Sequence, residues 1–211
     1  DAAILSAILE SFTSELSGVE FLVPTSNPGF VNEKYGKRYN VKAVDIMPWN
    51  LSFRFFGLPT IRCLLKSDVA FICDDIIFGK KLFNPSFNLL ITLFPLAILA
   101  KLCRCKLVCY SVGIGPFPRG RGERLAKILI QSCDFIMIRE EESKRLAQRI
   151  GVTKPIELTG DAAFVNPVSS EERALDIARK CGINLKKPLL GINITGYVDS
   201  WMKDDGSQSD S

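Results

Sequence analysis

The chain has 211 residues, 47% of them hydrophobic and 24% charged, which is enough for one sizeable hydrophobic core. Lys and Arg number 27 against 23 for Asp and Glu, and this net charge of +4 is too small to indicate a nucleic-acid-binding protein. The sequence contains no His. This excludes a Ser/His/Asp or Cys/His catalytic arrangement, so acid–base chemistry would fall to Asp, Glu, Lys, Tyr or Cys.

The first residues predict an amphipathic helix. Apolar residues at positions 4, 5, 8, 9 and 12 recur at helical spacing, and Asp1 stands where an N-cap would stand. A short apolar run over 19–23 then predicts a strand. A helix that begins at residue 1 and leads into a strand is typical of the middle of a β-α-β unit. We therefore expect a first strand and its loop upstream of Asp1.

Further strands and a helix are expected in the next fifty residues. The predicted strands cover 41–47 and 68–73. Between them, a helix within 51–66 should be disturbed by Pro59, because proline removes a helical hydrogen bond.

Residues 87–103 are the most apolar segment of the chain. They include Asn88, Thr92 and Pro95 and fall short of the ~20 residues that a membrane span requires. We therefore interpret the segment as a core helix and predict no membrane span.

The cysteines are odd in number, and most lie in apolar runs or near predicted helix ends. Such thiols behave as small buried hydrophobes, which indicates a reducing, cytoplasmic compartment. Cys103, Cys105 and Cys109 lack the paired C-x-x-C spacing of a zinc site, and no His is present. The sequence therefore favours structural thiols and predicts no metal.

Residues 106–161 carry the clearest pattern. Apolar runs over 106–111, 134–138 and 156–159 alternate with helical patterns over 122–132 and up to 150. This alternation predicts β-α-β units and a Rossmann-like, doubly wound parallel sheet.

Each of these strands ends in small, polar or charged residues. In open parallel sheets, ligands bind beyond the carboxyl ends of the strands. We therefore expect one rim to collect Ser111, Gly113 and Gly115, then Arg139, Glu140 and Ser143, then Thr159, Gly160 and Asp161.

The C-terminal part predicts the beginning of a second domain. Residues 161–168 look irregular, and Ser169 with Glu172 has capping-box spacing before a helix over 171–181. A strand is expected over 188–195, and the polar residues 203–211 should be disordered. We thus expect a Rossmann-like domain over 1–185 and the start of a truncated α/β domain over 186–211.

Several segments together resemble the polysaccharide pyruvyl transferase family. They are DAAIL at 1–5, YSVGIGPF at 110–117, DFIMIREEES at 134–143, GV at 151–152 and LTGDAAF at 158–164. The resemblance covers essentially residues 1–200. It implies two Rossmann-like domains facing each other across a cleft, as in the glycosyltransferase B architecture. It also implies pyruvyl transfer from phosphoenolpyruvate to a saccharide acceptor, with no metal or organic cofactor.

Arg139 is the first candidate site residue. It follows an apolar strand, and its planar guanidinium suits a carboxylate or a phosphate, both of which phosphoenolpyruvate carries. The structural alternative is a salt bridge to Glu140–Glu142 or an interaction with a neighbouring helix dipole. Glu140 to Glu142 are explained as favourable charges at a helix N-terminus.

The other candidates also have structural alternatives. Gly113 and Gly115 permit close approach of a ligand, or simply form a tight turn. Asp161 suits a general acid or base, or a turn residue that accepts backbone N–H groups. Ser143 is also expected as a cap or first-turn residue of a helix. The predicted catalytic residues are Arg139 and Asp161, and the predicted substrate-binding residues are Asp1, Ser111, Gly113, Gly115, Arg139 and Ser143.

These observations and the resemblance lead to three alternative hypotheses for the function. The first is pyruvyl transfer by the full-length protein in cell-surface polysaccharide biosynthesis. The second is a nucleotide-sugar glycosyltransferase of the same architecture, and the third is a catalytically silent domain fragment. The partners implied are phosphoenolpyruvate and a saccharide, with no nucleic acid, while the acceptor sugar and the oligomeric state stay open.

Overall fold

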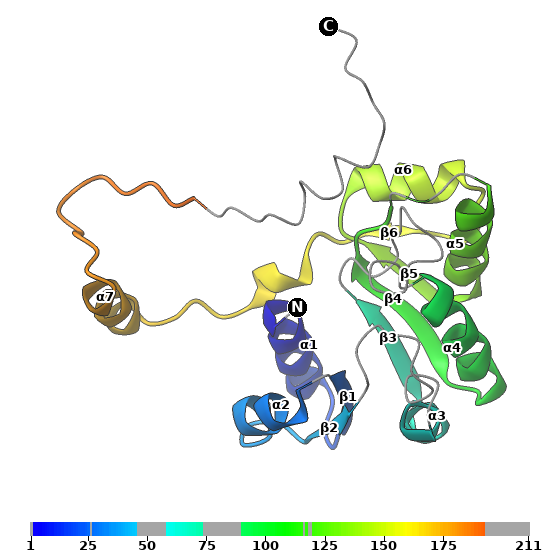
Figure 1. Ribbon diagram of the computed structural model, residues 1–211, viewed down its shortest axis with the longest axis horizontal. Helices are drawn as coiled ribbons and strands as arrows, with labels where there is room; N and C mark the ends of the chain where they lie inside the picture. The colour runs from blue at the N-terminus through cyan, green and yellow to red at the C-terminus, as the bar shows by residue number, and fades with distance from the viewer. Residues whose placement is uncertain are drawn as a thin grey trace, which may run out of the picture. The chain divides into compact units, whose positions relative to one another are not determined.

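A computed structural model describes residues 2–25, 27–45, 58–73, 90–115, 117 and 120–192. The chain divides into two compact units, Asp1–Asn166 and Pro167–Ser211 (Figure 1). The first unit holds both sheets and all the predicted site residues, whereas the second contains one described helix. The predicted domain limits, 1–185 and 186–211, stay predictions.

The first sheet is a parallel pair. Strands β1 (Phe21–Thr25) and β2 (Val41–Asp45) pair in register from Phe21 with Val41 to Thr25 with Asp45. Helix α2 (Pro28–Tyr35) connects them and begins at Asn27, whose side chain accepts the Phe30 N–H at 3.1 Å. A crossover helix between parallel neighbours is the expected β-α-β unit. β1 begins two residues later than the predicted 19–23.

The second sheet has four parallel strands in the order β3-β4-β5-β6. These strands are β3 (Val69–Cys73), β4 (Lys106–Val112), β5 (Phe135–Ile138) and β6 (Glu157–Leu158). The prediction of a parallel sheet through 106–111, 134–138 and 156–159 is confirmed. Helix α6 (Glu141–Arg149) links β5 to β6.

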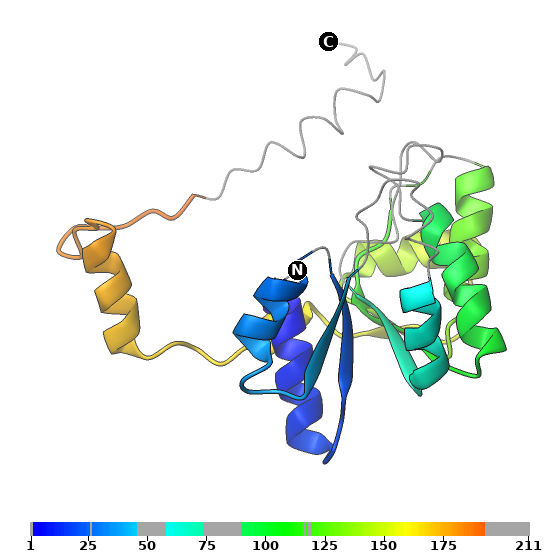
Figure 2. The ribbon, with the colours of Figure 1, turned by 60° about the horizontal axis from the view of Figure 1, so that its bottom comes forward.

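Helices cover both faces of this sheet. Helices α3 (Leu58–Lys66), α4 (Leu90–Leu102) and α5 (Arg121–Ser132) lie in a row on one face (Figure 2). α4 and α5 pack there in a core with Ile72 and Cys109. On the other face, α1 (Ala2–Glu15) places Phe12 against the rings of Phe71 and Tyr110, at 5.0 and 5.9 Å between centroids. The architecture is α/β and consistent with a Rossmann-like fold.

Two prolines lie within these helices. Pro59 is the second residue of α3, where its missing N–H costs little. Residues 51–57 lie outside the described residues, so the expected disturbance stays a prediction. Pro95 lies inside α4. Among the described residues, no helix has both the length and the apolar character needed to cross a bilayer.

The segment after β6 differs in three details from the prediction. Residues predicted as irregular include a short 3-10 helix, η1 (Ala162–Val165). Helix α7 (Glu171–Lys180) is capped by Ser170, not Ser169, because the Ser170 hydroxyl reaches the Arg173 N–H. Residues 188–192 form no strand, because a lone segment has no neighbour to pair with; the rest of that predicted strand lies outside the described residues.

Candidate functional site

The carboxyl ends of β4, β5 and β6 meet at one edge of the four-stranded sheet, because the three strands are neighbours and parallel. The segments that follow these three strands therefore lie at one rim, as the sequence predicted. The side-chain contacts show how each predicted site residue is used in the folded chain.

Arg139 and Asp161 form an ion pair at the rim. Arg139 directly follows β5, and its backbone N–H donates to the Val112 carbonyl at 3.2 Å. Its Nη1 lies 3.2 Å from Oδ2 of Asp161, and the two side chains are 18% and 30% exposed. The two predicted catalytic residues are thus brought together, in a place that solvent reaches only in part.

Asp161 also caps η1. Its Oδ1 accepts the Ala163 N–H at 2.8 Å, while its Oδ2 accepts from Arg139. The carboxylate is therefore oriented from both sides. The predicted turn role of Asp161 is therefore confirmed, and its role as a general acid or base stays a prediction.

Ser111 has an unusual backbone for a strand residue. Its φ is +54°, a left-handed conformation that is rare and costly outside glycine. The β4–β5 pairing shifts register between Cys109 and Val112, around this residue. The buried Ser111 hydroxyl donates to the Gly160 carbonyl. Ser111 thereby holds the turn before Asp161 against the end of β4.

Ser143 is buried at the start of α6 and fastens the loop after β4. Its Oγ accepts the Ile114 N–H at 3.0 Å and donates to Oε1 of Glu140 at 2.6 Å. Ser143 lies in the first turn after the cap residue Glu140, so the expected first-turn position is confirmed.

Gly115 is the glycine whose conformation the turn requires. Its φ is +87°, and a Cβ at this position would collide with Cδ2 of Leu146. The loop therefore lies directly on α6. Gly113, two residues earlier, is buried. A ligand role for the two glycines stays a prediction.

Two features of the rim escaped sequence reasoning. Glu140 was interpreted as a rim residue, a charge for the helix dipole or a partner for Arg139, but its bond from the Ser143 hydroxyl was not predicted. A Glu three residues before a Ser at a helix start was the available signal. Nothing in the sequence marked the left-handed Ser111. Asp1 lies outside the described residues, so its predicted role stays a prediction.

The described residues contain no group of three His, Cys, Asp or Glu side chains that could hold a metal ion. Cys109 and Cys133 lie fully buried with their sulfurs 3.3 Å apart. The hydrogen bond with Cys133 and the burial both raise the pKa of the Cys109 thiol well above its ordinary value. This thiol is therefore a core group and not a nucleophile.

Comparison with known protein families gives a match over most of the chain. The family model described as "Polysaccharide pyruvyl transferase" matches residues 1–203. A search of curated proteins and a search of solved structures each found no match. The matched range includes β1 to β6 and every candidate site residue. The chain belongs to the polysaccharide pyruvyl transferase family, a family of transferases.

Proposed function

We propose that the full-length protein transfers the pyruvyl group of phosphoenolpyruvate to a saccharide, in the biosynthesis of a cell-surface polysaccharide. The observation that carries this proposal is the Arg139–Asp161 pair at the carboxyl rim of a chain that belongs to a pyruvyl transferase family. Because Cys105, Cys109 and Cys133 are buried thiols, we also propose a reducing, cytoplasmic compartment.

The chemistry requires an acid and a group that binds oxyanions. Protonation of the methylene carbon of phosphoenolpyruvate makes the adjacent carbon electrophilic. Two hydroxyls of the acceptor then bond to that carbon, and phosphate leaves with the C–O bond electrons. Each hydroxyl loses its proton: one replaces the proton given to the methylene carbon, and the other goes to the phosphate. Cationic donors that face the departing phosphate stabilise its charge in the transition state.

Arg139 is the proposed donor-binding residue. Its guanidinium has five N–H donors in a planar fork, which matches either the carboxylate or the phosphate of phosphoenolpyruvate. Asp161 keeps this fork in place through Nη1. Charge-assisted bonds of this kind are worth about 1.5–3 kcal/mol each, so the orientation of Arg139 should matter for donor use.

Asp161 is proposed to take part in proton transfer or to orient an acceptor hydroxyl. One of its oxygens holds η1 and the other faces Arg139. Ser111, Gly113, Gly115 and Ser143 are proposed to shape the substrate-binding rim, and Asp1 is proposed as a further substrate-binding residue. We further propose a glycosyltransferase-B-like architecture in which a second domain closes over this rim.

A donor comparison on the full-length protein tests the proposal. Phosphoenolpyruvate and a panel of sugar nucleotides are each offered with a panel of saccharides, and phosphate, nucleotide and product mass are measured. We expect phosphate release that requires both phosphoenolpyruvate and an acceptor, with a product heavier by one pyruvyl ketal. Release of nucleotide from a sugar nucleotide, with no consumption of phosphoenolpyruvate, would instead identify a glycosyltransferase.

A further inference from the structure

The opposite end of the four-stranded sheet carries a second surface feature. Helices α3, α4 and α5 run in a row against the sheet (Figure 2), so their C-terminal turns lie beside the amino ends of β3, β4 and β5. Hydrogen bonds join these parts: the Lys106 N–H donates to the Asp68 carbonyl at 2.8 Å, and the Asp134 N–H to the Leu107 carbonyl at 2.6 Å. We call residues 62–69, 98–106 and 128–135 the amino-end face.

Large apolar side chains are exposed on this face. Leu65 is 64% exposed, Leu102 74% and Phe135 66%. Val69, Ile98 and Ile128 are also exposed. Between α4 and α5, a mostly apolar groove continues this surface; it is lined by Phe94, Ala97, Ile98, Lys101, Leu102, Ile128, Leu129 and Ser132. Exposed apolar side chains gathered at one end of a sheet and its helices are typical of an interaction surface.

The same face is basic. It holds five Lys and Arg residues against two Asp, an excess of three charges, whereas the whole chain has an excess of four. Lys101 is paired with Asp134 at 2.7 Å. Within the described part of the chain, no acidic side chain forms an ion pair with the remaining four, which are Arg62, Lys66, Arg104 and Lys106.

Helix stability explains only part of this arrangement. Lys66 and Lys101 lie in the last turns of α3 and α4, where positive charge is favourable beside the helix C-terminus. That effect does not account for Arg104 in the following loop or for Lys106 on β4, and it gives no reason for three exposed large apolar residues among them.

We propose that the amino-end face docks the protein onto an anionic lipid bilayer surface. The exposed apolar side chains would enter the interfacial region, while the four unpaired cations would face lipid phosphates. The combination of basic and apolar side chains matches a headgroup layer better than it matches a purely acidic protein surface. The carboxyl rim lies at the other end of the strands, so docking leaves the candidate site accessible.

Vesicle co-sedimentation tests the docking. The full chain is mixed with vesicles of phosphatidylcholine containing about one-third phosphatidylglycerol, and with vesicles of phosphatidylcholine alone. We expect binding to the anionic vesicles that weakens as salt is added. Each cation near the surface contributes about fivefold to partitioning, so Arg104→Glu with Lys106→Glu should reduce binding more than about tenfold. Leu65→Ser with Leu102→Ser should also reduce it, by about tenfold.

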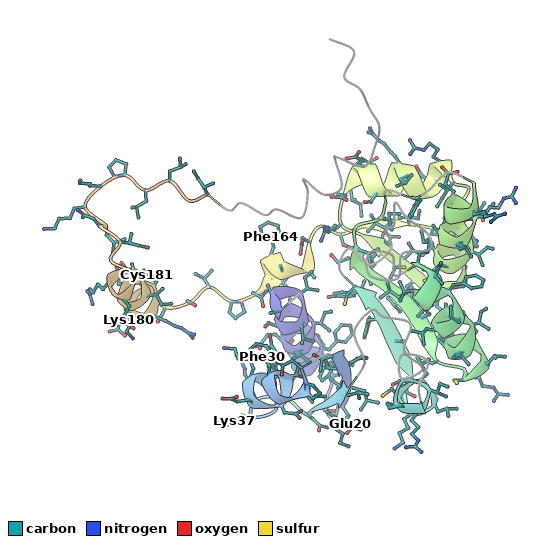
Figure 3. All side chains as sticks on the ribbon, viewed as in Figure 1. Glu20, Phe30, Lys37, Phe164, Lys180 and Cys181 are labelled. Carbon is teal, nitrogen blue, oxygen red and sulfur yellow. The ribbon has the colours of Figure 1, made fainter. Side chains whose placement is uncertain are left out.

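Matched variants in or just after α2, and just after α1, serve as controls. Lys34→Glu with Lys37→Glu reverses two exposed cations elsewhere (Lys37 is labelled in Figure 3), and Leu16→Ser removes another exposed apolar side chain. Both should bind as the parent does, and thermal unfolding should confirm that every variant is folded. Absence of binding to anionic vesicles, or an equal loss in the controls, would overturn the proposal. It would also be overturned if the amino-end variants instead abolished a dimer seen in solution, since the face would then bind a second copy.

Discussion

The two ends of the four-stranded sheet carry similar ion pairs in different surroundings. At the carboxyl end, Arg139 pairs with Asp161 at 3.2 Å, and at the amino end Lys101 pairs with Asp134 at 2.7 Å. Both pairs join segments that are far apart in sequence. The side chains of both pairs are partly shielded from water. Neither pair is therefore a fully solvated surface ion pair of the kind that contributes little to stability.

The surroundings of the two ion pairs differ. Oδ2 of Asp134 also accepts the Leu107 N–H at 2.8 Å, which ties β4 to β5 where both begin. Burial raises the pKa of Asp134, but the bonds from Lys101 and the Leu107 N–H, with the charges of Lys101 and Lys106, hold the pKa below its usual value. The Asp134 carboxylate is therefore held in its charged form by the fold itself.

At the carboxyl end, the pair stands among backbone features that cost stability. The backbone of Ser111 is in the left-handed conformation. Gly115 also has a positive φ, and any side chain there would collide with Leu146. Strained backbone of this kind persists where surrounding contacts over-determine it, often at functional sites. The amino-end pair thus ties two strands together, whereas the carboxyl-end pair lies among strained backbone at the rim where we propose that the donor binds.

The largest effect should follow loss of Arg139. If its guanidinium binds the donor, Arg139→Ala in the full-length enzyme removes about 2–4 kcal/mol of charge-assisted binding, or roughly 30- to 1,000-fold in kcat/KM for phosphoenolpyruvate. Arg139→Lys should recover only part of this, because an ammonium lacks the planar fork. Steady-state kinetics and thermal unfolding are measured on both variants.

The matched control is Arg145→Ala, which removes an exposed arginine paired with Glu141 on α6. Its kinetics should stay close to those of the parent. A folded Arg139→Ala variant with unchanged donor kinetics would remove Arg139 from the site, and a lowered Tm with normal kinetics would make its role structural.

A smaller but still large effect is expected at Gly115. Gly115→Ala places a Cβ against Leu146 and forces a side chain into a positive φ, so it should cost about 2–3 kcal/mol of unfolding free energy. Gly120 also has a positive φ of +75°, but no described atom lies within 4 Å of a Cβ built there. Gly120→Ala should therefore cost only about 1 kcal/mol. Urea unfolding of both variants measures the difference; equal costs would mean that the contact with α6 is unimportant.

The smallest effect concerns Asp134. Asp134→Asn keeps an acceptor for the Leu107 N–H but loses the ion pair, and should cost about 1 kcal/mol at neutral pH. Because folding lowers the pKa of this carboxyl group, its contribution is present above the unfolded pKa of about 4 and fades as the pH falls through the lower folded value. The difference in Tm between parent and variant should shrink over that range.

Asp176→Asn is the control for that measurement, since Asp176 pairs with Lys180 on the exposed surface of α7. Its effect should stay within about 0.5 kcal/mol. A difference between the parent and Asp134→Asn that is constant from neutral to acid pH would contradict the assignment of the charged form to the folded state.

Local sequence patterns were sufficient for most elements of the first unit, although α2 and η1 were not predicted. Apolar runs of 4–7 residues between helical patterns indicated β4, β5 and α5 nearly to the residue, because burial on both faces requires such runs in a parallel sheet. The ends were less well determined. β1 lies two residues later than predicted and Ser170 replaces Ser169 as a cap, since neighbouring Ser residues offer the same capping chemistry.

The sequence by itself determined the fold class, the family and the list of residues at the rim. The rim residues follow from strand direction, because the carboxyl ends of neighbouring parallel strands lie at the same edge of a sheet. Only the tertiary structure decided how those residues are used. The bonds of Arg139 with Asp161, of Ser111 with Gly160 and of Ser143 with Ile114 join positions 22, 49 and 29 residues apart. Such contacts depend on the register and bulge of packed strands, which a linear pattern does not encode.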